Sequence, residues 1–232
     1  MAGPDVLELQ HQLVAAGYQL GVLDGIYGPT TAAAVRGFQR DHHLEADGVV
    51  GPQTRAAIQT AQAGTRGQSS PLGLAALAEA IKYVGIKEAP PDSNRTPFGA
   101  WFGVDGVAWC NIFVSYCFAR GANYVLADDF KGGRGAGIYA GKGCSYVPTT
   151  EAWLRATGMW LGRVAPAPGD IAIYNWDGGE PDHIGIVAQY LGNGEFEAIE
   201  GNTGIGNDSN GGQVMRRVRH LVQVNGFGRV LA

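Results

Sequence analysis

Charged residues are scarce in this chain. They make up 16% of its 232 residues, and 17 Lys and Arg against 21 Asp and Glu leave a formal net charge of −4. No run of charges of one sign occurs along the sequence. A nucleic-acid-binding surface needs clustered Lys and Arg to neutralise phosphates, so the sequence predicts no nucleic-acid partner.

Long apolar runs are missing as well. No stretch approaches the roughly 18 uninterrupted apolar residues of a spanning helix, so the sequence predicts no membrane insertion. Residues 1–5 (MAGPD) lack the basic segment and the apolar core of a secretion signal. We therefore expect that the chain does not export itself by the general secretory route.

Only three cysteines are present, Cys110, Cys117 and Cys144. Such a small, odd number argues against a disulfide framework, and the absence of a C-x-x-C motif argues against a zinc site. At most one pair could form a disulfide. On one helix, Cys110 and Cys117 would lie about 10 Å apart along the axis, which is too far for a disulfide. A reactive thiol is therefore a candidate function for one cysteine.

A twelve-residue pattern occurs twice near the N-terminus, at 24–35 (DGIYGPTTAAAV) and 47–58 (DGVVGPQTRAAI). In each copy Asp-Gly predicts a tight turn, and the following proline is suited to the first turn of a helix. With an amphipathic helix before the first copy, the repeat predicts a small all-α domain over residues 1–62. Residues 63–71 are small and polar and predict a flexible linker.

Helices precede strands in the remaining part, residues 72–232. Apolar patterns predict helices near 72–84, 109–120 and 149–157, and alternating patterns predict strands near 170–174, 183–190, 195–200, 213–221 and 227–231. Asn193-Gly194 predicts a tight turn between two of these strands. Helices followed by a meandering antiparallel sheet indicate an α+β domain.

Cys110 stands at the predicted start of the helix near 109–120. The N–H groups and the positive end of the helix dipole favour the thiolate of such a cysteine, and a thiolate is the nucleophile for acyl transfer. His183, at the start of a predicted strand, is the candidate base. When each residue is considered alone, alternatives remain: Cys110 can be a buried structural thiol, and His183 can be an exposed histidine without a catalytic role.

The predicted hairpin adds two polar residues to the histidine. If Asn193-Gly194 forms a two-residue turn, Gly185 lies opposite Asn202, and His183 shares a face with Glu200 and Asn202. In this register Asn202 is the diagonal neighbour of His183, and Glu200 lies one same-face step further away. A bulge would bring Glu200 closer.

These four residues are the components of a thiol hydrolase. In such an enzyme the thiolate attacks a carbonyl, and the imidazole holds the proton and returns it to the leaving amine. A carboxylate or amide bound to the far ring nitrogen fixes the orientation of the imidazole. Glycosidase chemistry would use a carboxylate pair instead, but it leaves the cysteine and histidine unexplained.

Both parts of the chain resemble known families. The repeat D-G-x-x-G-P-x-T-x-x-A-[VI] is similar to the small helical peptidoglycan-binding domain found beside many cell-wall hydrolases. The C-terminal part resembles the CHAP family, the cysteine- and histidine-dependent amidohydrolases/peptidases. The segments that carry this second resemblance are Trp109–Phe118, Pro168–Ile171, His183–Val187 and Ile199–Asn202.

The CHAP resemblance implies a papain-like α+β catalytic domain with an antiparallel sheet. It implies Cys110 as the nucleophile, His183 as the general base, Glu200 as the residue that orients His183, and Asn202 as a support of the site. Many papain-like enzymes carry a glutamine oxyanion donor shortly before the nucleophile, but residues 103–109 contain none. Backbone N–H groups at the helix start, including that of Cys110, are the remaining candidates.

Substrate-binding candidates are aromatic residues near the site and polar residues of the repeat. Trp101, Trp109 and Trp153 are candidates for lining a groove, with a place in the core as the alternative. Asp24, Tyr27 and Asp47 are candidate wall-binding residues. We expect no metal and no cofactor, although some relatives of the CHAP family bind calcium. The carboxylates available for calcium are Asp92, Asp105, Asp128, Asp129 and Asp208.

Together these observations predict a peptidoglycan hydrolase that acts on bacterial cell wall as a monomer. The bond we expect it to cut is the N-acetylmuramoyl–L-alanine amide, with cleavage in a stem peptide or cross-bridge as the first alternative. A transferase that uses the same thioester and a non-catalytic wall-binding protein are further alternatives. The chain is similar to bacteriophage endolysins, which are made in the host cytoplasm and reach the wall after the membrane is permeabilised.

Overall fold

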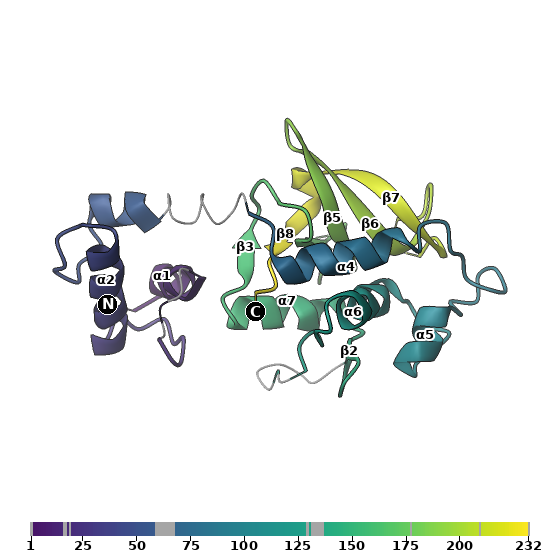
Figure 1. Cartoon of the computed structure of the whole chain (residues 1–232), viewed down its shortest axis with the longest axis horizontal. Helices are drawn as coiled ribbons and strands as arrows, with labels where there is room; N and C mark the ends of the chain where they lie inside the picture. Colours follow the sequence, from purple (N-terminus) through teal and green to yellow (C-terminus); the bar gives the residue numbers. More distant parts are fainter. Residues whose placement is uncertain are drawn as a thin grey trace. The chain divides into compact units, whose positions relative to one another are not determined.

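The structure, a computed structural model, divides into two compact units, one built on Met1–Gln68 and the other on Ser69–Leu154 and Trp160–Ala232 (Figure 1). It describes residues 2–15, 18, 20–58, 68–128, 130, 137–176, 178–208 and 210–231. Of the predicted linker at 63–71, residues 63–67 lie outside the described residues, and Pro71 is the first residue of a helix. No helix within the described residues is long and apolar enough to cross a membrane.

The first unit is helical, as the repeat predicts. Helix α1 spans Pro4–Ala15 and helix α2 spans Pro29–Asp41, and residues 52–58 form a further helical segment. The prolines of the two repeat copies, Pro29 and Pro52, begin their helices. Apolar side chains from all three helical segments form one core, made of Leu9, Leu13, Leu20, Ala34, Val35, Phe38 and Ile58.

A buried glutamine organises the turn of each repeat copy. Gln10 donates from Nε2 to Asp24 Oδ1 (3.0 Å) and to Thr31 Oγ1 (3.0 Å), and its Oε1 accepts from the Gly25 N–H (2.8 Å). The second copy repeats this arrangement with a glutamine from α2.

In the second copy Gln39 donates to Asp47 Oδ1 (2.8 Å) and to Thr54 Oγ1 (3.0 Å), and it accepts from the Gly48 N–H (2.8 Å). Both glutamines are almost fully buried. Each therefore satisfies the polar groups of a turn that would otherwise be buried without partners.

The second unit contains a six-stranded antiparallel sheet with the order β3-β8-β4-β5-β6-β7. The α+β class predicted from the sequence is confirmed. The strands are β3 (Trp160–Gly162), β4 (Ile171–Tyr174), β5 (His183–Gly192), β6 (Glu195–Thr203), β7 (Gln213–His220) and β8 (Val224–Gly228). A 3-10 helix, η1 (Leu221–Gln223), precedes β8, and β1 (Ile138–Tyr139) pairs with β2 (Gly143–Cys144) in a separate ribbon.

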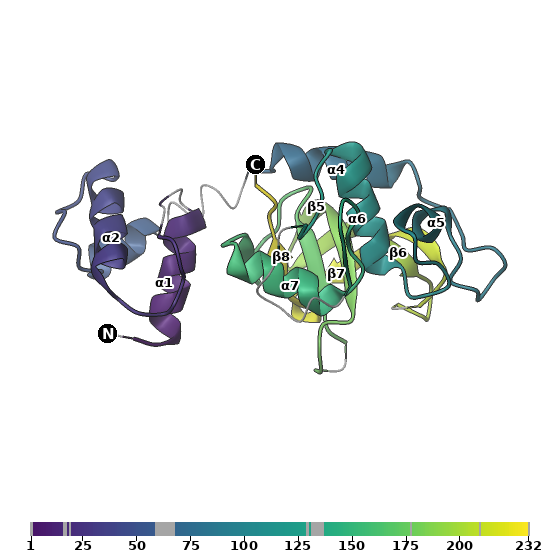
Figure 2. The same ribbon diagram turned by 90° about the horizontal axis from the view of Figure 1, so that it is seen from below.

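Four helices accompany the sheet: α4 (Pro71–Ile81), α5 (Pro97–Phe102), α6 (Cys110–Gly121) and α7 (Val147–Ala156). Helices α4 and α6 lie side by side against β5 and β6 (Figures 1 and 2). The contact between α6 and the sheet is close, because a Cβ at Gly201 would lie 2.7 Å from Phe113 Cβ and 2.8 Å from Trp109 Cζ3. The helix that begins at Cys110 is thus fixed on the strand that carries Glu200.

Two strands of the six-stranded sheet differ from the sequence prediction, and the short ribbon of β1 and β2 was not predicted either. The last strand is β8 at Val224–Gly228, three residues earlier than predicted, and it lies between β3 and β4 inside the sheet. Strand β3 was not predicted. Its three residues are too few to show an alternating pattern, and its pairing with β8 is irregular between Trp160 and Gly162.

We expect Gln39→Leu to lower the free energy of unfolding of the first unit by about 1–3 kcal/mol. The leucine leaves the buried Gly48 N–H without its acceptor, and the side chains of Asp47 and Thr54 lose the donor that Gln39 provides. A buried polar group without a partner costs about 1–3 kcal/mol. Thermal and urea unfolding of the full chain would measure the change. Gln12→Leu is the matched control, since the Gln12 side chain bonds only the exposed side of α1 at Glu8. Equal stabilities of the two variants would contradict the proposed role of Gln39.

Candidate active site

Cys110 is the first residue of α6, and the helix start lacks a side-chain cap. Trp109 is the N-cap residue and, within the described residues, provides no capping hydrogen bond. In contrast, Ser70 and Thr96 cap α4 and α5 by accepting from the N–H groups of Gly73 and Gly99. The first N–H groups of α6 therefore keep their capacity to bind an anionic oxygen. Cys110 itself is 5% exposed.

His183 is the first residue of β5 and is fully buried. Its Nε2 lies 3.1 Å from Glu200 Oε2. Its other ring nitrogen, Nδ1, has no hydrogen-bond partner of good geometry among the described residues. The Cys110 thiol nevertheless lies close enough to the ring to affect its protonation. The ring thus has one nitrogen committed to a carboxylate and one left for the thiol.

The protonated form of His183 is favoured. Burial lowers the pKa of the ring, but the hydrogen bonds and charges of Cys110 and Glu200 outweigh burial and raise the pKa to about 9. This folded-state pKa exceeds the usual value of about 6.5. The protonated ring therefore stabilises the fold fully below about pH 6.5, and this contribution is lost as the pH rises through about 9.

The register of the hairpin differs from that of an uninterrupted two-residue turn. Gly185 lies opposite Glu200, rather than opposite Asn202. The pairing of β5 with β6 shifts twice, between Val187 and Gln189 and between Tyr190 and Gly192. Two shifts of one residue keep His183 and Glu200 on the same face. They also move Glu200 to the position diagonally opposite His183, which explains their direct contact.

Gly185 makes room for this contact. A Cβ at this position would lie 2.7 Å from Glu200 Cγ and 3.1 Å from the carbonyl oxygen of Ile199. The Glu200 side chain therefore passes over the glycine on its way to His183. A residue with a side chain at 185 would displace the carboxylate.

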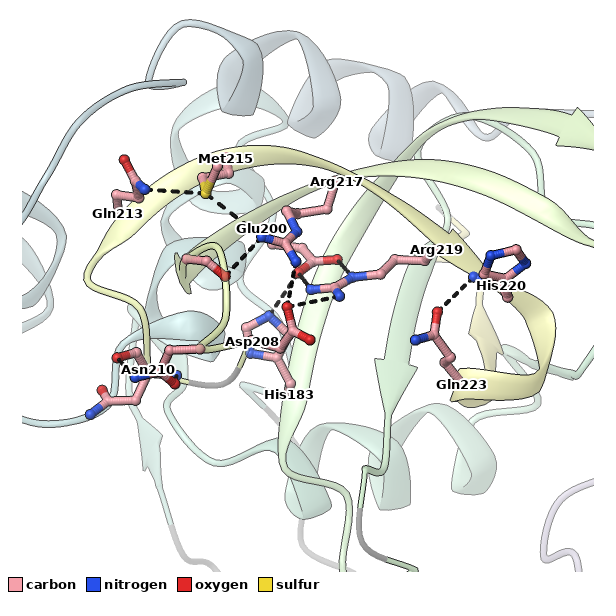
Figure 3. Close-up of polar contacts among 12 residues, drawn as sticks. His183, Glu200, Asp208, Asn210, Gln213, Met215, Arg217, Arg219, His220 and Gln223 are labelled. Carbon is pink, nitrogen blue, oxygen red and sulfur yellow. Dashed lines mark hydrogen bonds and ion pairs between the residues drawn. The ribbon is translucent and has the colours of Figure 1, made fainter.

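Glu200 is also bound by an arginine that the sequence analysis did not identify. Arg219 of β7 donates from Nε to Glu200 Oε1 (2.9 Å) and from Nη2 to Glu200 Oε2 (2.6 Å), as Figure 3 shows. Burial raises the pKa of Glu200, but the hydrogen bonds and charges of Arg219 and His183 outweigh burial and lower it to about 2. The sequence contained only a partial signal, because alternation along the predicted strand puts Arg219 on the same face as Arg217 and Met215. The pairing of Met215 with Glu200, which brings this face to the carboxylate, is visible only in the structure.

Asn202 is buried in the same region, but its side chain turns to another residue. Its Nδ2 donates to Asn210 Oδ1 (3.2 Å), and no hydrogen bond joins it to His183 in the described part of the chain. Its backbone is left-handed, with φ 58°, and the pairing of β6 with β7 is irregular between Glu200 and Thr203. The structure thus brings His183 and Glu200 into contact and directs Asn202 to the following loop.

The predicted groove aromatics occupy different environments. Trp109 is fully buried against Phe98 and Phe113, and Trp153 is 5% exposed. Both side chains are therefore buried in this structure, in the core position that was given as the alternative. Trp101 is partly exposed, and the Lys142 ammonium lies 4.4 Å from its ring centre.

A different set of residues lines a groove of about 750 Å³ in this unit. It includes Ala108, two residues before Cys110, and Glu180, three residues before His183. Tyr146 donates a hydrogen bond to Glu180 (2.7 Å) within this groove. The other lining residues, mostly apolar, are Val104, Val107, Gly137, Tyr139, Ser145, Pro148, Thr149 and Ala152.

The candidate wall-binding residues of the first unit have structural contacts. Asp24 and Asp47 each accept a hydrogen bond from a glutamine and one from a backbone N–H two residues later, and these bonds lower the pKa of both carboxyls. Tyr27 donates to the Gly48 carbonyl (2.6 Å) and also lines a cavity of about 360 Å³. Tyr27 therefore combines a structural bond with access to a cavity.

All three cysteines are free thiols. Cys117 is fully buried, and burial and the charge of Glu79 raise its pKa well above the ordinary range. Cys144 is buried as well, and burial raises its pKa. Within the described residues no group of three or more His, Cys, Asp or Glu side chains is arranged to hold a metal ion. Asp129, one of the carboxylates considered for calcium, lies outside the described residues.

Comparison with protein-family models gives two matches. Residues 2–58 match a peptidoglycan binding domain, and residues 102–202 match the CHAP domain. The chain carries both domains. No curated protein sequence matches it. The CHAP match includes Cys110, His183, Glu200 and Asn202, and it ends before Arg219. A wall-binding domain joined to a CHAP domain supports a peptidoglycan hydrolase, with peptidoglycan as the partner.

We expect Gly185→Ala to lower the pKa of His183 by about one unit from about 9. The new methyl group displaces Glu200, and a hydrogen bond between charged groups contributes about 1.5–3 kcal/mol, against about 1.4 kcal/mol per pKa unit. NMR titration of the labelled histidine ring would measure the shift. Gly51→Ala is the control, since a Cβ there meets no atom within 4 Å. An unchanged titration in Gly185→Ala would show that the glycine is not needed for the contact.

Proposed function

We propose that the chain is a cysteine-dependent peptidoglycan hydrolase in which Cys110 is the nucleophile and His183 moves the proton. The observation that carries this proposal is the arrangement of the histidine. His183 is buried, its Nε2 is bound by Glu200, and its Nδ1 is left for the thiol at the start of α6. A pKa of about 9 keeps the ring protonated at neutral pH, as a thiolate–imidazolium pair requires.

The reaction follows from this charge distribution. The Cys110 thiolate forms a bond to the carbonyl carbon of the scissile amide, and the electron pair of the carbonyl moves to its oxygen. The carbon–nitrogen bond then breaks as His183 gives its proton to the leaving nitrogen, and a thioester remains. Water attacks the thioester and gives a proton to His183, and the carbon–sulfur bond breaks to release a carboxylic acid and the thiolate.

Oxyanion stabilisation is assigned to the backbone. The N–H groups in the first turn of α6 are uncapped by the N-cap side chain and lie next to the nucleophile, where they suit the developing negative charge. This assignment accounts for the sequence lacking a glutamine in the residues just before Cys110.

For the scissile bond we propose the N-acetylmuramoyl–L-alanine amide. The lactyl and alanyl groups on the two sides of this bond each carry a methyl group, and the groove is lined by small apolar residues such as Val107 and Ala108, which precede Cys110 in the chain by three and two residues. One observation favours the alternative, cleavage within the peptide. Glu180 is the charged residue among the described groove-lining residues, and its carboxylate complements the ammonium group of a diamino acid in a stem peptide.

The first unit is assigned the role of holding the protein on the wall. Linking a binding domain to a catalytic domain raises the local substrate concentration. This division of roles is that of bacteriophage endolysins, and we propose that the protein acts in this way, reaching the wall from the host cytoplasm once the membrane is permeabilised.

Digestion of purified peptidoglycan tests the proposal directly. We expect the wild type to release peptides that begin with L-alanine, together with glycan carrying free lactyl carboxyl groups, as identified by mass spectrometry. Cys110→Ala should hydrolyse peptidoglycan at least about 1,000-fold more slowly than the wild type, a decrease on the order of that seen when a catalytic nucleophile is removed. Cys117→Ala is the matched control, because Cys117 lies on the same helix, α6, and its thiol is fully buried.

Three other results would change the conclusion. New amino and carboxyl ends within the stem peptide would assign an endopeptidase with the same residues. Full activity of Cys110→Ala would contradict the thiol mechanism. Binding to the wall without release of fragments by the wild type would indicate a non-catalytic wall-binding protein.

We expect Ala152→Trp to reduce hydrolysis of peptidoglycan at least tenfold by filling the groove that Ala108 and Glu180 also line, in which we propose that the substrate lies. Alkylation of Cys110 by iodoacetamide should be unchanged, because a small reagent does not need the groove. Ala100→Trp, on the exposed side of α5, is the matched control. Turbidity loss of a wall suspension and mass spectrometry of the alkylated thiol would measure the two effects. Undiminished hydrolysis by Ala152→Trp would show that the substrate lies elsewhere.

A further inference from the structure

Arg219 lies on β7 with its side chain almost fully buried, 3% exposed. Its two hydrogen bonds reach both carboxylate oxygens of Glu200, a bidentate arrangement that fixes the plane as well as the position of the carboxylate. Oε2 of Glu200 accepts from Arg219 Nη2 and faces His183 Nε2 at the same time. The atom that orients the histidine is therefore held by the arginine.

The arginine is itself held from two sides. Its guanidinium lies over Trp176, 4.9 Å from the ring centre, and over Tyr174, 5.6 Å from the ring centre. Its remaining terminal nitrogen, Nη1, lies 3.0 Å from Asp208 Oδ1. Figure 3 shows the resulting row of charged groups from His183 through Glu200 and Arg219 to Asp208.

Asp208 connects this row to the loop that follows β6. The same Oδ1 accepts from Arg217 Nη2, and Arg217 Nη1 donates to the Gly204 carbonyl (2.8 Å). Gly204 lies two residues after Asn202 in the chain. The position of the guanidinium is thus determined by its packing on aromatic rings and by a loop carboxylate.

The charge of Arg219 has a consequence for Glu200. A buried carboxylate without a cation takes up a proton more readily, because burial disfavours its charged form. The hydrogen bonds of Arg219 oppose burial and keep Glu200 ionised. Only an ionised Glu200 carries the negative charge that stabilises the protonated ring of His183.

We propose that Arg219 is a positioning residue of this site, which acts on the Cys110–His183 pair by holding the carboxylate of Glu200 in place and charged. This inference rests on the proposed function in one respect only, the role of Cys110 as nucleophile. Within the described residues the charged partners of Arg219 are Glu200 and Asp208. Its effect on His183 therefore passes through Glu200.

A second buried ion pair of the same unit provides a matched control. Arg229 donates from Nε to Asp170 Oδ1 (2.7 Å) and from Nη2 to Asp170 Oδ2 (2.8 Å), and both side chains are nearly fully buried. This pair has the same bidentate geometry as Arg219–Glu200, but its carboxylate is that of Asp170 and not that of Glu200, the residue that contacts His183. A purely structural role of Arg219 would therefore make Arg219→Lys and Arg229→Lys behave alike.

The test compares Arg219→Lys, Arg229→Lys and Asp208→Asn in the full chain. Three quantities are measured: the NMR titration of His183, the pH profile of Cys110 alkylation by iodoacetamide, and the rate of peptidoglycan hydrolysis. Lysine keeps the charge but cannot make the bidentate contact. We expect Arg219→Lys to lower the titration midpoint of His183 by about one pH unit. The rate of peptidoglycan hydrolysis should fall by about 10- to 100-fold, as it does when a catalytic group is misplaced. Asp208→Asn should shift both in the same direction by a smaller amount.

Arg229→Lys should lower the melting temperature without moving the titration or the alkylation profile. Equal shifts in Arg219→Lys and Arg229→Lys, or an unchanged His183 midpoint in a folded Arg219→Lys, would overturn the proposal. If Arg219→Lys does not fold, an unchanged titration in Asp208→Asn overturns it instead. The titration and alkylation readouts do not require hydrolysis, so they test Arg219 even if the wild type proves inactive on peptidoglycan.

Discussion

The structure of the second unit depends on one buried carboxylate between two cationic side chains. Glu200 has no exposed surface, and its oxygens meet Arg219 and His183. Removing charges from water costs several kcal/mol for each ion, and only good geometry with further hydrogen bonds offsets that cost. Strands β5, β6 and β7 must therefore keep their register for the three charges to meet. Helix α6, which begins at Cys110, packs on β5 and β6, so the same register also sets where Cys110 lies relative to the ring.

Much of this site was accessible from the sequence, because local signals determined it. The cysteine at a helix start, the histidine at a strand start and the Asn193-Gly194 turn together indicated that His183 and Glu200 share a face. Their contact distance was not accessible, because a turn fixes the register only in its own neighbourhood. The two shifts between Val187 and Gly192 depend on packing along the whole hairpin. Arg219 was missed because its approach to Glu200 depends on the loop between β6 and β7, whose length does not define a register.

The first unit shows a similar limit. The Asp-Gly and Gly-Pro signals predicted its turns and helix starts, since each signal acts on adjacent residues. The roles of Gln10 and Gln39 were not predicted. Their aspartate partners, Asp24 and Asp47, lie 14 and 8 residues away in the chain and become neighbours only after the helices pack. Aromatic residues show the same limit. For Trp109 and Trp153 the sequence left a groove and the core as alternatives, since composition does not show which side of an element faces the core, and both side chains are buried in the structure.

The hydrogen bond from Tyr27 to the Gly48 carbonyl joins a residue of the first repeat copy to the turn of the second. The corresponding residue of the second copy is Val50, which has no hydroxyl group to offer a following turn. A third copy placed after the second would therefore lack this contact, whereas in solenoid repeats every unit presents the same contact to the next.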